Sequence, residues 1–136
     1  MLWEFAVPGT AISLQSKRAK APWTEKVRQF GTANMDTSLF PILIEVAVTV
    51  VFFYDSSSAD VDNILKPVLD GLYPEIILDD SMVNEVIGAK RDVSNGISLR
   101  NPPGIIIPLL AGRDPFVYVG IESAMDQEDM PCLSAI

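Results

Sequence analysis

The feature that most constrains the fold is the apolar run from Ile42 to Phe53, which only Glu45 and Thr49 interrupt. Residues at both odd and even positions are apolar and β-branched side chains dominate, which is typical of a strand buried on both faces. Such a strand lies inside a sheet that helices cover. The run is also far shorter than the roughly 20 apolar residues that a membrane-spanning helix needs. The sequence therefore predicts a layered fold of helices and strands.

Shorter periodic segments predict the other elements. A helix is predicted over residues 22–35, with Trp23, Val27 and Phe30 as its buried stripe. A second helix is predicted to begin at Asn63 as its N-cap, because Pro67 then falls in the first turn. Further strands are predicted at 2–7, 75–78, 82–93 and 116–122. Together these elements predict an α/β (α+β) fold, one compact domain with a mixed β-sheet and two main helices.

Length and composition predict one soluble domain. The chain of 136 residues fits a single domain, expected over 1–123, in which the apolar loop 101–113 covers the core or docks on a partner subunit. Residues 124–136 are acidic and aperiodic, which predicts a mobile tail. The one cysteine, Cys132, excludes an internal disulfide framework and a multi-cysteine zinc site. The N-terminus does not resemble a signal peptide, so a cytoplasmic protein without membrane contact is expected.

The charge distribution bears on nucleic-acid binding. A net charge of −8 disfavours it, since nucleic-acid binders usually carry a basic patch. However, residues 1–36 hold five basic and three acidic side chains, so the acidic excess lies further along the chain. Within this first part, Lys17 and Arg18 lie in a predicted loop, which is either simply solvated or in contact with phosphates.

Aspartates cluster where the predicted central strand passes into the second helix. Asp60 and Asp62 precede this helix in the prediction, and Asp79 and Asp80 form a turn after the next predicted strand. If those two strands are neighbours, both acidic pairs meet at one edge of the sheet. Mg²⁺ and Mn²⁺ prefer carboxylate ligands, and a divalent cation would relieve the repulsion between the acids. Alternatively, the aspartates are ordinary helix caps and turn residues.

A calcium-binding EF-hand loop starting at Asp60 is excluded, because Leu65 stands where that loop requires glycine. A sugar-nucleotide transferase of the D-x-D type is disfavoured by the short chain.

The spacing over the whole segment resembles the RusA family of Holliday junction resolvases. "DVDNILKPVLDGL" followed by "DDSMV" is similar to that family's pattern D-x-D-N-x-x-K-x-x-x-D-x-L and D-D-S-Q-[VI]. Lys90, ten residues after Asp80, also matches a lysine of the family, and the resemblance covers roughly residues 3–92. The matching residues are Asp60, Asp62, Asn63, Lys66, Asp70, Leu72, Asp79, Asp80, Ser81 and Val83.

The resemblance implies a function and a set of site residues. It implies a homodimeric, magnesium-dependent endonuclease that cuts four-way DNA junctions in recombination and repair, with Mn²⁺ able to replace Mg²⁺. The implied metal ligands are Asp60, Asp62 and Asp80, and Lys66 joins them as a catalytic residue. Asn63 and Asp79 would support these residues. Apart from the resemblance, Asp70 stands four residues after Lys66 on the predicted helix, a spacing that predicts a pair between Asp70 and Lys66. Lys17, Arg18 and Lys90 would contact DNA.

Some residues depart from the family pattern. Ser56, Ser57 and Ser58 stand where the family typically carries basic residues, and Met82 replaces the glutamine of D-D-S-Q. The loop 101–113 and the acidic tail do not map onto the family. These departures weaken the expected DNA surface, so a second hypothesis is a RusA-fold module that binds DNA or a protein without cutting. A third is an accessory domain whose aspartates only cap helices and turns.

Overall fold

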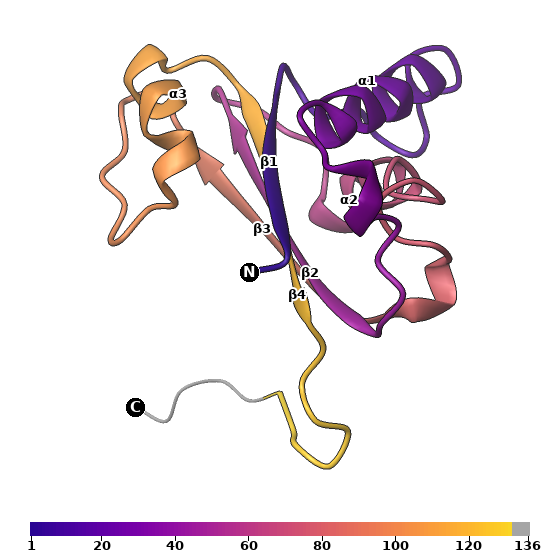
Figure 1. Ribbon diagram of the computed structural model, residues 1–136. Helices are drawn as coiled ribbons and strands as arrows, with labels where there is room; N and C mark the ends of the chain where they lie inside the picture. The colour runs from indigo at the N-terminus through magenta and orange to yellow at the C-terminus, as the bar shows by residue number, and fades with distance from the viewer. Residues whose placement is uncertain (132–136) are drawn as a thin grey trace.

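The computed structural model describes residues 1–131, and over this range the chain forms one compact α+β unit with a four-stranded mixed sheet (Figure 1). The predicted fold class is therefore confirmed. In chain order, the strands and α-helices are β1 (Trp3–Pro8), α1 (Lys20–Thr32), β2 (Val46–Tyr54), α2 (Val61–Asp70), β3 (Val83–Asp92), α3 (Ile107–Gly112) and β4 (Phe116–Ser123). Short 3-10 turns occur at η1 (Thr37–Leu39), η2 (Asp80–Met82) and η3 (Gly104–Ile106).

The sheet has the strand order β1-β4-β2-β3. β4 runs antiparallel to both β1 and β2, whereas β2 and β3 are parallel. A parallel pair needs a crossover connection, and α2 supplies it. β2 thus lies inside the sheet, as its apolar sequence predicts. Among the described residues, no helix is long and apolar enough to cross a membrane.

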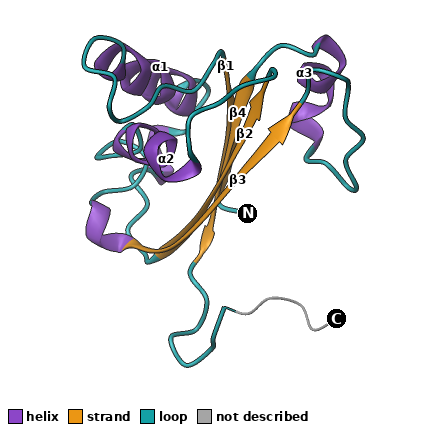
Figure 2. Ribbon diagram, turned by 180° about the vertical axis from the view of Figure 1, so that it is seen from behind, coloured by secondary structure: helices purple, strands orange, loops and turns teal. Residues whose placement is uncertain are grey.

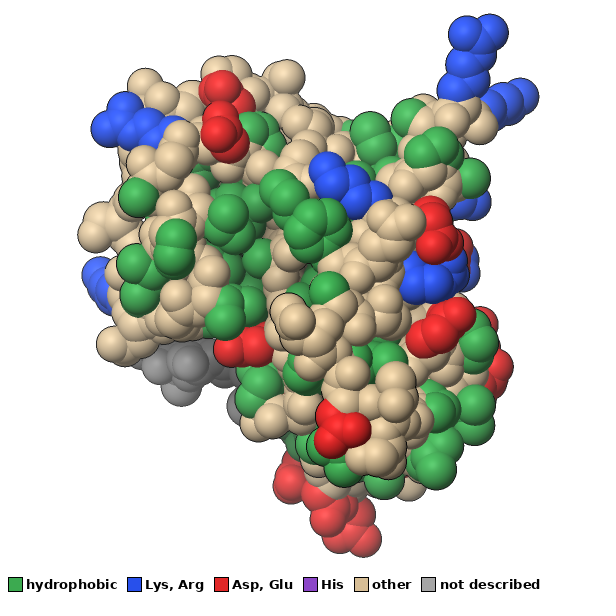
Figure 3. Space-filling view, turned by 45° about the horizontal axis from the view of Figure 1, so that its top comes forward, with side chains coloured by type: hydrophobic (Ala, Val, Ile, Leu, Met, Phe, Trp, Pro, Cys, Tyr) green, Lys and Arg blue, Asp and Glu red, His purple; other side chains and the backbone are tan. Residues whose placement is uncertain are grey.

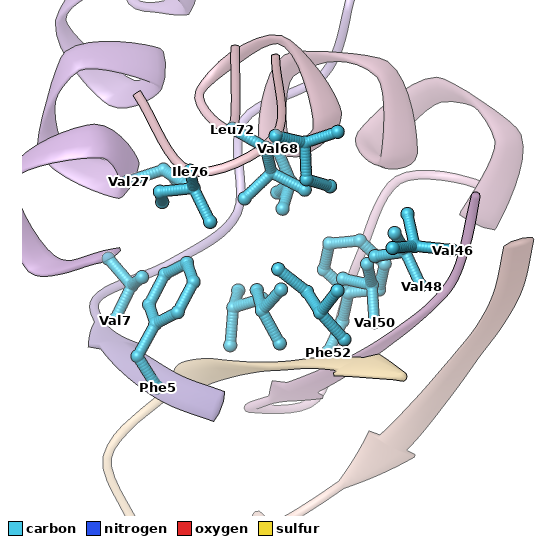
Figure 4. Close-up of a cluster of buried hydrophobic side chains, with 14 of the residues drawn as sticks. Phe5, Val7, Val27, Val46, Val48, Val50, Phe52, Val68, Leu72 and Ile76 are labelled. Atoms are coloured by element: carbon cyan, nitrogen blue, oxygen red, sulfur yellow. The ribbon is translucent and has the colours of Figure 1, made fainter. Parts of the chain in front are cut away.

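One face of the sheet packs against α1 and α2 (Figure 2). The side chains of Val46, Val48, Val50 and Phe52 alternate along β2 and are almost completely buried (Figure 4). They meet a layer from the two helices and from β1 that includes Val7, Val27, Ile64 and Val68. This is the main hydrophobic core, and it fixes α2 against the sheet.

The opposite face carries a smaller core at the end of the sheet near α3. The rings of Phe53 and Phe116 stack there with their centroids 4.3 Å apart. Ile106 of η3 is 2% exposed and belongs to this cluster. The apolar loop predicted at 101–113 is therefore partly helical and covers this second core, although Ile105 and Ile107 remain 40% and 55% exposed.

Several local predictions are corrected. Phe30 is not part of the core: the buried side of α1 runs through Trp23, Val27 and Gly31. Gly31 leaves room for Phe5, because a Cβ on this glycine would lie 2.8 Å from the Phe5 ring. Phe30, which was predicted to be in the core, therefore lies on the exposed side of α1.

The segments before β2 and after α2 also differ from the prediction. β2 begins at Val46 rather than at Ile42, and Ile44 is 50% exposed. Residues 75–78 are not a strand, because the N–H groups of Ile76 and Ile77 both donate to the Leu72 carbonyl. These bonds continue the turn after α2, so a single bridge between Ile42 and Ile77 is all that remains of the predicted pairing.

Gly71, where α2 ends against α1, provides a test of this packing. A Cβ at this position would lie 2.9 Å from the backbone oxygen of Thr24 and 2.9 Å from Val27. We expect Gly71→Ala to lower the free energy of unfolding by about 1–3 kcal/mol, since overpacking forces the helices apart. Urea denaturation measures this change. Gly104→Ala is the matched control, because a Cβ there meets nothing within 4 Å. Equal stability of the two variants would contradict the proposed packing.

Candidate functional site around helix α2

The acidic residues of interest lie at the start of α2 and in η2. Asp60 is the N-cap residue of α2 and Asp62 lies in its first turn. The helix thus begins before the predicted N-cap, and Asn63 is a helical residue rather than the cap. The prediction that Asp62 belongs to the preceding loop is therefore wrong. Asp80 lies in η2, directly before β3.

Pro67 lies inside α2, and the backbone group that it leaves unpaired is bonded to a distant loop. In a helix, the N–H of residue 67 would bond to the carbonyl of Asn63, but proline has no N–H. The backbone N–H of Leu14 donates to this free carbonyl instead, at 2.6 Å. The Thr24 hydroxyl donates to the Pro67 carbonyl at 2.9 Å. Because tertiary partners satisfy these backbone groups, proline is tolerated inside α2.

This contact fixes the loop between β1 and α1 to the first half of α2. Lys17 and Arg18 follow Leu14 in the same loop, so their backbone is placed near the helix that carries Asp62. In the sequence these cations are 45 and 44 residues away from Asp62. The contact between Leu14 and Asn63 brings this loop and α2 into one region of the molecule.

The two acidic pairs do not meet at one sheet edge by the predicted route. In the parallel pair β2–β3, Val46 is opposite Val83 and Tyr54 is opposite Asp92. Asp60 follows the C-terminal end of β2, whereas Asp80 precedes the N-terminal end of β3. These are opposite ends of the same strand pair, so the sheet edge does not bring the two acidic pairs together. Helix α2 spans the distance between them instead.

A charged group does form along the flank of α2. Lys66 donates a 2.7 Å hydrogen bond to Asp70, which is the predicted pair. This hydrogen bond raises the pKa of the Lys66 ammonium, and the charges of Asp70 and Asp80 act in the same direction against a partial burial that lowers it. Asp62, Lys66 and Asp70 follow each other at i, i+4 and i+8 and so share one side of the helix.

Tyr73 belongs to the same region, and the sequence did not single it out. Burial raises the pKa of its phenol to about 12, and the charges of Asp80, Asp70 and Asp79 add to this shift. The charges of all three acids therefore act on the same phenol. We call Lys66, Asp70, Tyr73, Asp79 and Asp80 the α2 flank cluster.

Asp79 has a local structural role. Its carboxylate accepts the backbone N–H of Ser81 at 3.1 Å and also the Ser81 hydroxyl. These hydrogen bonds lower the pKa of Asp79. For this residue, the turn function that the sequence left open is therefore present.

Lys90 holds the loop that leads into α2. Its ammonium donates to the carbonyl of Ala59 at 3.3 Å and lies 5.6 Å from the centre of the Tyr54 ring. Ala59 directly precedes Asp60, so Lys90 fixes the backbone from which the first acid projects. Two residues earlier in β3, Gly88 has no side chain and lets Val61 and Leu65 approach the strand. The sequence suggested DNA contact for Lys90, and the observed contact is with the protein's own loop.

Arg28 is another residue that the sequence did not select. Its guanidinium donates to the backbone carbonyls of Asp70 and Tyr73, at 3.2 and 3.3 Å. It thereby ties α1 to the turn that carries Tyr73. Elsewhere on the face shown in Figure 3, lysine and arginine side chains stand at several separate points, while acidic side chains gather toward the lower end. This view shows no continuous basic surface.

The donor chemistry of the acids fits a hard divalent cation. No lysine or arginine within residues 1–131 forms an ion pair with Asp60, Asp62 or Asp80. These three carboxylates therefore have no countercharge in direct contact, and carboxylate oxygen is the ligand type that Mg²⁺ and Mn²⁺ prefer. However, across the described part of the chain, no group of three or more His, Cys, Asp or Glu lies close enough together to hold a metal ion. Mg²⁺ commonly uses only one or two protein carboxylates, together with water and substrate phosphates.

The chain matches no protein-family model, and none of the curated proteins is detectably similar to it. The resemblance to the RusA pattern therefore depends on the motif residues alone.

The electrostatic grouping can be tested through Tyr73. Asp80→Asn should lower the pKa of Tyr73 from about 12 toward its ordinary value of 10.0, because the largest of the charge effects on this phenol is removed. Asp79→Asn should lower it less, since that carboxylate contributes the smallest of the three charge effects. An NMR titration of the Tyr73 ring measures both shifts. Identical values in the wild type and Asp80→Asn would place Asp80 away from Tyr73.

A second test concerns Pro67. Pro67→Ala restores an N–H that competes for the Asn63 carbonyl, so the Leu14 N–H should lose part of its hydrogen bond. We expect the Leu14 amide to exchange with solvent about fivefold faster, which corresponds to ~1 kcal/mol. Amide hydrogen exchange measures this. Pro22→Ala, in the first turn of α1, is the control and should leave Leu14 unchanged. Unaltered exchange in Pro67→Ala would mean that the proline does not control the loop.

Proposed function

We propose that this protein is a magnesium-dependent endonuclease of the RusA type that cuts branched DNA, with four-way junctions as its substrate. The observation that carries the proposal is a set of three carboxylates, Asp60, Asp62 and Asp80, that form no ion pair within residues 1–131. They lie at the start of α2, which also carries Lys66, and in η2. This set agrees residue by residue with the motif that suggested the family.

Each residue has a role in the proposal. Asp60, Asp62 and Asp80 would hold Mg²⁺ or Mn²⁺, which supplies Lewis-acid stabilisation of the phosphate and a more acidic water. Lys66 stays protonated because Asp70 and Asp80 raise its pKa, so its ammonium can donate to a phosphate oxygen. Asp70 orients Lys66 through their hydrogen bond. Asn63 contributes through its backbone carbonyl, which holds the loop of Leu14.

DNA contact is proposed for the loop that Leu14 fixes to α2. Lys17 and Arg18 would bind backbone phosphates on either side of the scissile bond, as cations near a nuclease site commonly do. Lys90 would support the site indirectly, by holding the backbone of Ala59 next to Asp60. Symmetric cutting of two opposed strands needs two sites, which supports a homodimer. We assign the activity to residues 1–123 and expect it in the cytoplasm.

A second candidate function is binding of DNA or of a protein partner without cleavage. It is favoured by the finding that no three carboxylates among residues 1–131 are grouped for a metal ion. The serines at 56–58 also favour the binding function, since they supply no cation near Asp60.

The two functions separate in one experiment with a synthetic four-way junction and Mg²⁺ or Mn²⁺. We expect the wild type to nick the junction and to leave linear duplex of the same sequence intact. Asp62→Asn and Asp80→Asn should each lower the rate by at least about 100-fold, since they remove proposed metal ligands rather than outer-shell groups. Glu128→Gln is the matched control, because it removes one negative charge outside the site.

Three outcomes are informative. Full cleavage in excess chelator would contradict the metal-dependent mechanism. Junction binding without cleavage under any divalent cation would select the binding function. Neither binding nor cleavage, combined with no calorimetric signal from Mg²⁺ or Mn²⁺, would leave the aspartates as caps and turn residues. Circular dichroism of the variants ensures that loss of activity is not loss of folding.

A further inference from the structure

Strand β1 is an edge of the sheet. Within residues 1–131 it pairs with β4 on one side and with no strand on the other. Figure 1 looks onto this edge, with α1 on one side of β1 and α3 on the other. An edge strand presents a row of backbone N–H and C=O groups that can pair with another extended chain.

A pocket of about 510 Å³ runs along this edge. Four consecutive residues of β1, from Trp3 to Ala6, line it. Successive side chains of a strand point to opposite faces of the sheet, so a pocket that touches all four follows the backbone edge rather than one face. The walls come from both layers of the fold. They are formed by Phe30, Ala33 and Asn34 at the end of α1 and by Ile105, Pro108 and Leu109 around α3.

A second pocket, of about 530 Å³, continues the first one, since Trp3 and Asn34 line both. Its outer wall includes Leu39 and Leu43, which are 70% and 67% exposed. Such exposed large apolar residues commonly mark an interaction site. Between the two pockets Trp3 is held in place, because its indole N–H donates to the Gly31 carbonyl at 2.8 Å. We call the two pockets together the β1 trough.

We propose that the β1 trough binds an extended segment of another protein, which adds to the sheet as a strand beside β1. The free backbone edge selects an extended chain over a helix, and the apolar walls select apolar side chains at alternating positions. Broad areas of exposed hydrophobic side chains at the left and centre of Figure 3 agree with an unpartnered surface on the side that carries α3.

Charge and shape narrow the partner further. Among the described residues, Glu4 and Asp36 are the ionisable ones that line the trough, and no lysine or arginine of residues 1–131 lines it. The bound segment should therefore carry lysine or arginine at its ends. A second copy of this chain fits less well. Its own β1 edge is flanked by α1 and α3 on both faces, and these would meet the walls of the trough. A single strand brings no such layers.

The test uses a synthetic peptide of alternating valine and threonine flanked by lysines, titrated into the isotope-labelled full chain. NMR should show saturable shifts at the amides of β1 and of the trough walls, with slower hydrogen exchange in β1. Phe30→Lys should weaken binding about tenfold or more, because it removes an apolar contact and repels the peptide. Leu39→Lys, at an exposed position of the other pocket, should also weaken it. Ile87→Lys is the matched control, since this exposed residue lies on the opposite edge strand, β3.

Four results would overturn the proposal. The first is the absence of saturable shifts in β1. The second is equal binding of a peptide whose central valine is replaced by proline, which would indicate nonspecific adhesion rather than strand pairing. The third is equal weakening by Ile87→Lys. The fourth is protection of the β1 amides that grows with protein concentration in the absence of peptide, which would make the edge a contact between copies. None of these results depends on the proposed nuclease activity.

Discussion

The packing of α2 against the parallel pair β2–β3 is the contact on which the rest of the structure depends. Ile64 and Val68 of the helix are completely buried in the main core. On β3, Gly88 has no side chain, which allows Val61 and Leu65 to lie directly on the strand. This close approach determines where the polar side of α2 is held, and therefore where Asp62, Lys66 and Asp70 are presented. The chemistry of the candidate site is thus a consequence of hydrophobic burial on the other side of the same helix.

Pro67 shows how one backbone defect can organise a larger region. Inside a helix, proline ordinarily costs a hydrogen bond and is strongly unfavourable. Here the carbonyl that it leaves free accepts the N–H of Leu14, and its own carbonyl accepts the hydroxyl of Thr24. Leu14 lies in the loop between β1 and α1, and Thr24 lies in α1 itself. The proline therefore replaces one local hydrogen bond with tertiary ones, and these bring the basic loop to the acidic helix.

The electrostatics of the α2 flank cluster leave an excess of negative charge. Lys66 neutralises Asp70, and Ser81 stabilises Asp79 through hydrogen bonds. Asp80 has neither kind of partner and instead raises the pKa values of Lys66 and Tyr73. A divalent cation carried in with a phosphodiester would complete this arrangement. A binding module would tolerate it through solvation, because the acids are exposed. The two candidate functions thus differ in whether a divalent cation, bound together with the substrate phosphate, draws the carboxylates together.

Local sequence patterns were sufficient to predict those elements that are determined by a few neighbouring residues. The alternation of Val46, Val48, Val50 and Phe52 predicted an interior strand, the i, i+4 spacing predicted the pair of Lys66 and Asp70, and "DDS" predicted a turn. Local patterns did not predict the ends of the elements or the tertiary contacts of their residues. The start of α2 depends on whether the Asn63 carbonyl finds a partner, and that partner, Leu14, lies 49 residues earlier.

The same difference between local and long-range contacts separates what the sequence determined about the site from what the tertiary structure determined. By itself, the sequence determined the types of residues, their order and the fold class, because periodicity and side-chain chemistry are local properties. Only the tertiary structure decided that Asp60 and Asp80 follow and precede opposite ends of β2–β3, that Lys90 holds Ala59, and that Tyr73 senses the acids. These relations depend on the parallel register and on the packing of α2. Both arise from contacts between residues far apart in the chain, which no local pattern records.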